Sequence, residues 1–130
     1  MRLQTSQEGN ARIGRWRFLA VVLALISASI HLLLSVVNLI PGETTVGLLF
    51  AAMGVGYVMV AGLVFRENLL LYQVAALYTA GLLLAFVASR LPIDSALPIE
   101  PVGLATKVDE GALLVVLLRL IRGLQKRPRS

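Results

Sequence analysis

The chain has 130 residues, of which 58% are hydrophobic and only 15% charged, and it contains no cysteine. A water-soluble domain usually carries about 25% charged residues, so lipid is the solvent that suits this composition. The absence of cysteine excludes disulfides, iron–sulfur clusters and cysteine-ligated zinc. The net charge of +5 does not indicate nucleic-acid binding, because the basic residues collect beside apolar segments rather than in one patch.

The chain opens with a polar, basic segment, residues 1–17, and then becomes apolar. The first apolar segment, residues 18–40, is long enough for a helix to cross a hydrocarbon core of about 30 Å. It stops at Pro41-Gly42-Glu43, which is a turn signal. A second apolar segment covers residues 46–65 and is followed by the short polar turn Arg66-Glu67-Asn68. These features predict two antiparallel transmembrane helices.

A third apolar segment covers residues 69–89, and the longest loop, 91–102, follows it. The fourth expected span, 103–125, carries several charged residues. Asp109 and Glu110 lie in its first turns, where the helix dipole favours acids, and Arg119 lies near the other end, where it can reach the headgroups. We expect this helix to cross the membrane, and a half-inserted or interfacial helix is the alternative.

The sequence thus predicts an all-α fold, an integral membrane four-helix bundle of two antiparallel helical hairpins. The transmembrane domain covers residues 18–125, between the basic segment 1–17 and a basic tail, 126–130.

The basic residues predict the orientation. The two termini and the turn after the second span together hold ten Lys and Arg residues, and the opposite side holds only Arg90 and Lys107. Because cytoplasmic loops carry the excess of Lys and Arg, both termini are expected in the cytoplasm of a multi-pass plasma-membrane protein.

Four polar side chains share one face of the first span. Their spacing of four, four and three residues places them on one side of a helix: Ser27, His31, Ser35 and Asn38. A polar stripe is unfavourable against lipid, so we expect it to face the bundle interior or a partner chain. We also expect it to supply hydrogen-bond partners for the hydroxyls of Tyr57, Tyr78 and Thr79 on the other spans.

His31 is the only histidine, and it lies near mid-membrane. An ionisable group at that depth is a candidate functional residue. Counting helical rise from the cytoplasmic ends places His31 about 20 Å deep and Glu110 about 21 Å deep, so Glu110 and its neighbour Asp109 are candidate partners. Lys107 lies three residues before Glu110, which allows these two side chains to pair along the helix.

Four roles for His31 stay open. It forms a structural hydrogen bond to a neighbouring helix, or it handles a proton or a quinone together with Glu110 or Asp109. As a haem ligand it would need a second histidine from another chain for bis-histidine ligation. As a ligand of another metal it lacks a supporting cluster. We therefore expect no metal site, no catalytic residue and no cofactor, with haem on His31 as the alternative.

Small residues gather on one side of the second span, where they allow two helix backbones to approach closely. They are Gly47, Ala51, Gly54, Ala61 and Gly62. Helix packing is the expected role of this side, and a pore-lining strip is the alternative.

Three short sequences carry a family resemblance: Ser-Ile-His-Leu-Leu-Leu at 29–34, the Pro-Gly turn at 41–42, and Lys-Val-Asp-Glu-Gly-Ala-Leu-Leu at 107–114. Together they resemble the small four-span membrane proteins of unassigned function common in archaea and actinobacteria. The resemblance covers most of the chain from residue 18 and implies no activity, cofactor or catalytic residue.

The expected function is that of a non-enzymatic accessory or structural subunit of a homo- or hetero-oligomeric membrane complex. Its expected partners are the lipid bilayer, copies of itself or other membrane subunits, and no nucleic acid. A small oligomeric transporter, channel or proton-coupled carrier built on His31 and Glu110 is the alternative. A quinone- or haem-binding redox subunit is a third reading, which rests on His31 alone.

Overall fold

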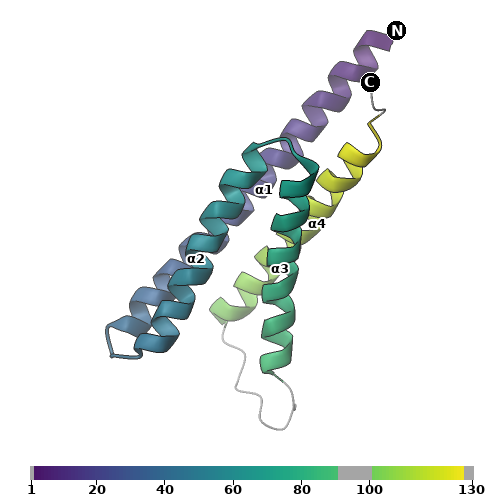
Figure 1. Ribbon diagram of the computed structural model, residues 1–130. Helices are drawn as coiled ribbons and strands as arrows, with labels where there is room; N and C mark the ends of the chain where they lie inside the picture. The colour runs from purple at the N-terminus through teal and green to yellow at the C-terminus, as the bar shows by residue number, and fades with distance from the viewer. Residues whose placement is uncertain (1, 91–100, 128–130) are drawn as a thin grey trace.

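The computed structural model describes residues 2–90 and 101–127, and all regular structure in these residues is helical (Figure 1). The helices are α1 (Arg2–Leu39), α2 (Thr44–Phe65), α3 (Leu69–Ser89) and α4 (Pro101–Gln125). The predicted all-helical class is therefore confirmed. Helix α1 begins at Arg2 and therefore includes most of the predicted basic segment 1–17.

Two parts of the sequence prediction fall largely outside this description. Residues 91–100 of the predicted loop 91–102 lie outside the described residues, and Pro101 and Val102 belong to α4. The last three residues of the predicted tail, 128–130, also lie outside them.

Local chemistry explains where the helices begin and end. After α1 the backbone turns at Gly42, whose φ of 93° lies in the left-handed region that favours glycine. The side chain of Asn68 caps α3 by accepting hydrogen bonds from the backbone N–H groups of Leu70 (2.9 Å) and Leu71 (3.4 Å). Proline is well suited to the first turn of a helix, and α4 begins at Pro101.

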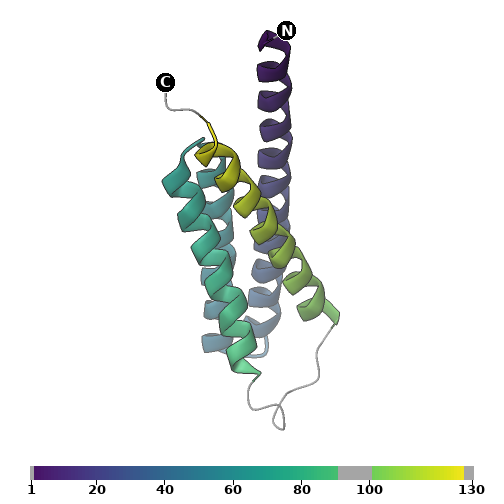
Figure 2. The same ribbon diagram turned by 90° about the vertical axis from the view of Figure 1, so that its right-hand side faces the viewer.

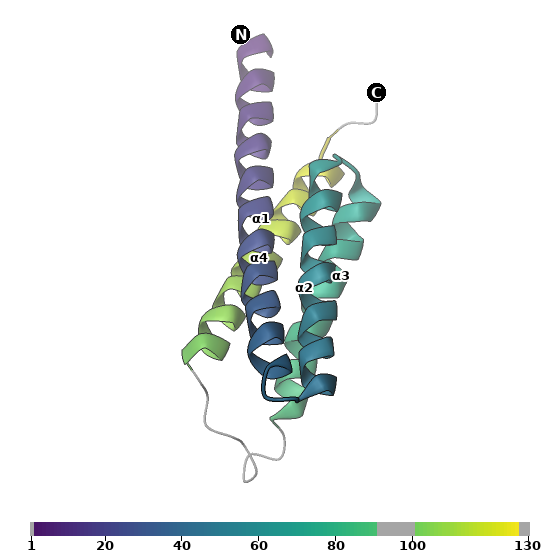
Figure 3. The same ribbon diagram turned by 90° about the vertical axis from the view of Figure 1, so that its left-hand side faces the viewer.

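The helices pack unequally. The closest pair is α1 and α2, which run antiparallel side by side, while α2 and α3 touch little although they are consecutive. Helix α4 runs obliquely and packs against both α1 and α3 (Figures 2 and 3). It therefore connects α3 to the α1–α2 pair.

Helix α1 extends well beyond the other three helices at its N-terminal end (Figure 2). Its 38 residues correspond to about 57 Å, whereas a hydrocarbon core is about 30 Å thick. At the same end of the bundle, the Arg127 guanidinium lies 2.6 Å from Glu67 and donates to Asn10 at 3.2 Å. These exposed contacts bring the α2–α3 turn and the end of α4 to α1.

The interior of the bundle is narrow. Helix α1 contributes the small buried residues Ala20, Ala24 and Ala28, which let neighbouring helices approach its backbone. The largest buried apolar side chains come from the other helices and include Tyr57 and Leu117. Close packing thus depends on small side chains on one helix facing large ones on the others.

Glycines on α2 bring its backbone against α1. A Cβ atom built on Gly54 would lie 2.7 Å from Leu32 Cγ and 3.2 Å from the Ala28 carbonyl oxygen. A Cβ atom on Gly47 would likewise lie 2.5 Å from Leu39 Cγ. Ala61 is buried and Ala51 half-buried. Gly62, by contrast, is exposed, and a Cβ atom there meets nothing within 4 Å, so it does not take part in packing within the chain.

Large apolar side chains cover the outside of the bundle. Leu77 is 74% exposed and Leu84 is 69% exposed, and apolar residues on the outer sides of α1 and α2 are similarly open. Among the described residues, three helices are long and apolar enough to cross a membrane: Gln7–Leu39 within α1, then α2 and α3. Helix α4 is not among these three, because its charged residues lower its mean hydropathy.

The close α1–α2 contact predicts that Gly54→Val destabilises the protein. The added side chain meets Leu32 and the Ala28 carbonyl, so the helices must separate, at a cost of roughly 1–3 kcal/mol. Gly62→Val is the matched control, because the same substitution on the same helix enters open space. Unfolding in detergent measures both variants, and equal losses of stability would contradict the packing described.

Candidate functional site

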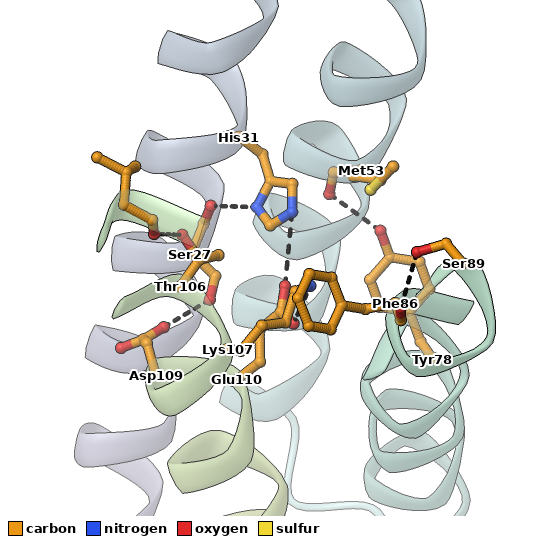
Figure 4. Close-up of polar contacts among 11 residues, drawn as sticks. Ser27, His31, Met53, Tyr78, Phe86, Ser89, Thr106, Lys107, Asp109 and Glu110 are labelled. Atoms are coloured by element: carbon orange, nitrogen blue, oxygen red, sulfur yellow. Dashed lines mark hydrogen bonds and ion pairs between the residues drawn. The ribbon is translucent and has the colours of Figure 1, made fainter. Parts of the chain in front are cut away.

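Polar side chains gather inside the bundle where α1, α2 and α4 meet (Figure 4). We call this group the polar cluster. Its members are Ser27, His31, Tyr57, Lys107, Asp109 and Glu110. Glu110, Ser27 and Tyr57 have no exposed surface, and His31 is 2% exposed. So many polar groups in an apolar bundle make this the candidate functional site.

The centre of the polar cluster is the contact between His31 and Glu110. Nε2 of His31 lies 3.5 Å from Oε1 of Glu110, with 3% and 0% of the two side chains exposed. On the other side of the ring, Nδ1 lies 2.8 Å from the backbone carbonyl oxygen of Ser27. A carbonyl oxygen only accepts, so Nδ1 carries a hydrogen and donates it. The proton state of the ring then depends on Nε2.

Lys107 neutralises the other oxygen of Glu110. Its Nζ donates to Oε2 at 2.6 Å, one turn away along α4, as the spacing of three residues predicts. The same ammonium lies 5.0 Å from the centre of the Phe86 ring of α3, as does the Arg90 guanidinium. An aromatic face attracts a cation, so Phe86 helps to hold Lys107 beside Glu110.

Ser27 joins Asp109 to the same network. Its hydroxyl donates to Asp109 Oδ2 at 2.5 Å, while its backbone carbonyl accepts from His31. Asp109 is half-buried, in contrast to the fully buried Glu110 beside it. One residue of α1 thus contacts the histidine and one of the two carboxylates of α4.

Aromatic rings enclose His31 on the α2 side. The Tyr57 ring lies 5.4 Å and the Phe50 ring 6.0 Å from the imidazole, measured between ring centres. Tyr78 of α3 packs edge-on against Tyr57 at 5.3 Å. These rings exclude water, which strengthens the electrostatic interactions of the polar cluster.

Two buried oxygens in the polar cluster lack a hydrogen-bond partner within the described part of the chain. They are the Tyr57 hydroxyl and Oε1 of Glu110, the atom that faces His31. The 3.5 Å separation from Nε2 is within the range of an ion pair but too long for a good hydrogen bond. A buried group of this kind normally gains a partner, such as a water molecule or a proton-bearing neighbour.

The predicted polar stripe divides into two parts. Ser27 and His31 belong to the polar cluster, and Glu110 and Asp109 meet them there. Ser35 is also buried. Asn38 is only half-buried, and its side chain donates to the Leu34 carbonyl of its own helix at 2.7 Å. The side chain of Asn38 therefore makes its hydrogen bond within α1 and is not part of the polar cluster.

The prediction that this stripe supplies the partners of Tyr78 and Thr79 is wrong. The Tyr78 hydroxyl donates to the Met53 carbonyl of α2 at 2.9 Å, in the space left by Gly56. The Thr79 hydroxyl donates to the Ala75 carbonyl of its own helix at 3.0 Å. The carbonyl one turn back is within reach of a threonine hydroxyl, so Thr79 needs no second helix, whereas the longer Tyr78 side chain reaches the backbone of α2.

Sequence reasoning did not include Phe86 or the ring of Tyr57 in the site. Phe86 lies one turn before the end of α3, and only the position of α3 against α4 brings it to Lys107. Within the residues that the structure describes, no three His, Cys, Asp or Glu side chains lie so that they could hold a metal ion together.

The chain matches a family described as "Family of unknown function (DUF7475)" over residues 5–121 and belongs to that family. No curated protein and no solved structure matches it.

The His31–Glu110 contact predicts non-additive losses of stability. His31→Leu and Glu110→Gln should each destabilise the protein in detergent, because each leaves a buried polar group unpaired. In the double variant the total should differ from the sum by about 1–3 kcal/mol, as for other contacting pairs.

The control cycle pairs Glu110→Gln with Asn38→Leu. Asn38 lies about two turns from His31 and bonds only to its own helix, so these two losses should add. Additive losses in the His31–Glu110 cycle as well would mean that the two side chains do not interact.

Proposed function

We propose that this DUF7475 protein is a non-enzymatic, multi-pass protein of the plasma membrane that serves as a subunit of a homo- or hetero-oligomeric membrane complex. The observation that carries this proposal is the amount of apolar side-chain surface that the bundle leaves open. A single copy buries little of α2 and α3, so further helices can pack on them.

Helix α4 is part of this proposal as a fourth span. Its charged residues Lys107 and Glu110 lie towards the bundle and pair with each other, whereas Val108 is 66% and Val115 54% exposed. A helix on a water-soluble protein has the opposite pattern, with charges outside. An apolar outer side and neutralised charges inside suit a helix surrounded by lipid.

The charge distribution supports two cytoplasmic termini and the arrangement of two antiparallel hairpins. Ten Lys and Arg residues belong to the termini and the α2–α3 turn, and two belong to the opposite side. In the bundle, Arg127 contacts both Glu67 and Asn10, so the basic regions lie at one end of the molecule. The excess of basic residues at this end supports a cytoplasmic location for it.

A proton-coupled carrier or channel is the second candidate function. The buried ion pairs of the polar cluster favour it, because intramembrane ionisable groups often mark ion pathways. Haem or quinone redox chemistry has less support, since both nitrogens of His31 already face protein oxygens. Proton flux into liposomes that disappears in His31→Ala, but not in Asn38→Ala, would favour the carrier over the subunit.

The proposed topology predicts a pattern of labelling in cells. The chain has no cysteine, so single-cysteine variants give an unambiguous signal. A membrane-impermeant maleimide should label Glu43→Cys and Asp94→Cys in intact cells. Gln7→Cys and Gln125→Cys should react only after permeabilisation. Labelling of Gln125→Cys in intact cells would show that α4 does not cross the membrane.

The proposed subunit role predicts that the protein assembles. In mild detergent its native mass should exceed that of a 14.0 kDa monomer, either as multiples of one chain or with a second protein at fixed stoichiometry. Native mass spectrometry of protein purified from its own membrane measures this. A monomer at all concentrations, with no stoichiometric partner, would contradict the proposal.

A further inference from the structure

We infer that the protein binds an anionic phospholipid in a groove on the N-terminal half of α1, where Arg12 and Arg15 hold the headgroup phosphate and Leu19 contacts the acyl chains. The inference rests on the proposed location in the plasma membrane, and it names one partner within that membrane. It does not depend on which subunits or copies the protein assembles with.

The groove lies on one face of α1. Its lining residues are Arg12, Arg15, Trp16 and Leu19, and its volume is about 310 Å³. Their spacing of three, one and three residues places the four side chains on one side of the helix, within about two turns. The groove belongs to the half of α1 whose end extends beyond the other helices (Figure 2).

The two arginines of the groove carry charge that the protein itself does not neutralise. Arg12 and Arg15 are both exposed, and in the described part of the chain neither forms an ion pair with a carboxylate. Arg17 and Arg127, at the same end of the molecule, both contact Glu67, at 3.9 Å and 2.6 Å. The cations of the groove are therefore open to an anion from outside the chain.

An indole ring forms one wall of the groove. Trp16 is half-buried, and the Arg119 guanidinium of α4 lies 4.9 Å from the centre of its ring. An aromatic face attracts a cation, so this contact fixes the ring and adds a positive charge at the wall of the groove. Arginine is well suited to bind phosphate, and tryptophan is enriched at the level of the headgroups.

The position of the groove along α1 matches the layers of a bilayer. The first apolar segment begins at Phe18, so Leu19 lies at its edge. A helix rises about 1.5 Å per residue, which places Arg15 about 6 Å and Arg12 about 10 Å beyond Leu19 along the axis. The headgroup layer on each side of the hydrocarbon core is roughly 5–8 Å thick. Arg15 therefore lies within this layer and Arg12 near its outer edge, where lipid phosphates are found.

These features favour a lipid over a soluble anion. A soluble anion would use only the positive charges, whereas a phospholipid also uses the apolar end of the groove at Leu19. A lipid with a net negative charge fits better than a zwitterionic lipid, because it brings no ammonium group towards the arginines. Phosphatidylglycerol is a probe with this chemistry.

The test uses the fluorescence of Trp16, which is the only tryptophan of the chain and lines the groove. The protein is reconstituted in vesicles of phosphatidylcholine with a constant minor fraction of phosphatidylglycerol. Bromine, which quenches an adjacent indole, is placed on the acyl chains of either the phosphatidylglycerol or an equal amount of the phosphatidylcholine. The brominated phosphatidylglycerol should bind beside Trp16 about fivefold more strongly, which is the effect of roughly one basic residue on an anionic lipid. Equal quenching by the two lipids would overturn the inference.

Two double variants of equal net charge identify the residues responsible. The first replaces the arginines of the groove, Arg12→Gln with Arg15→Gln, and should remove the preference for phosphatidylglycerol. The second, Arg66→Gln with Lys126→Gln, removes two exposed charges that do not line the groove, and should keep the preference. Loss of the preference in both double variants, or in neither, would overturn the assignment to the groove. Circular dichroism checks folding, and the wild-type comparison decides the question if a variant does not fold.

Inorganic phosphate distinguishes a lipid from a soluble anion. Added at constant ionic strength, it should leave the preference for brominated phosphatidylglycerol unchanged, and a loss of the preference would overturn the inference in favour of a soluble anion.

A carbonate wash of the vesicles separates this inference from the proposed function. An integral membrane protein stays in washed vesicles whether or not the groove holds an anionic lipid. Retention of the protein with equal quenching would refute the lipid site alone. Removal of the protein by the wash would refute the membrane location and the lipid site together.

Discussion

The cost of burying charge in an apolar medium governs the structure of this protein. Helix α4 carries Lys107, Asp109 and Glu110 into a bundle whose outer surface is apolar, and each charge has an opposite charge or a hydrogen bond beside it. An uncompensated charge buried among apolar side chains would cost several kcal/mol. The inward orientation of α4 and its contact with α1 both follow from this requirement.

The narrow interior of the bundle fits the proposed membrane location. In water, a bundle is stabilised by burying apolar surface, but a lipid surrounding would remove most of that advantage. What remains is close packing and polar contact. Gly47 and Gly54 bring α2 against α1, and the polar cluster brings α4 against α1. Helix α1 takes part in both kinds of contact, with Ala28 and Leu32 against Gly54 of α2 and with Ser27 and His31 against α4.

Much of the fold could be predicted from local sequence features. The turn at Gly42, the cap at Asn68 and the long apolar segments act over a few residues, so they do not depend on distant parts of the chain.

The candidate site was predictable in part. Helical spacing places Ser27 and His31 on one face, and the depth of Glu110 matches that of His31. Helical periodicity does not predict the oblique course of α4. That course brings α4 to Ser27 and His31 on this face, whereas Asn38 bonds to its own helix. Periodicity also could not distinguish Gly54, which faces α1, from the exposed Gly62.

The sparse contact between α2 and α3 has a mechanical consequence. Since α3 contacts the rest of the bundle largely through α4, the seam between α2 and α3 holds the sparsest of the contacts between helices. Tyr78 bridges this seam, with its ring against Tyr57 and its hydroxyl on a carbonyl of α2. Because Tyr78 packs on Tyr57 and Tyr57 packs on the imidazole of His31, a tilt of α3 relative to α2 would reach His31 through these two rings.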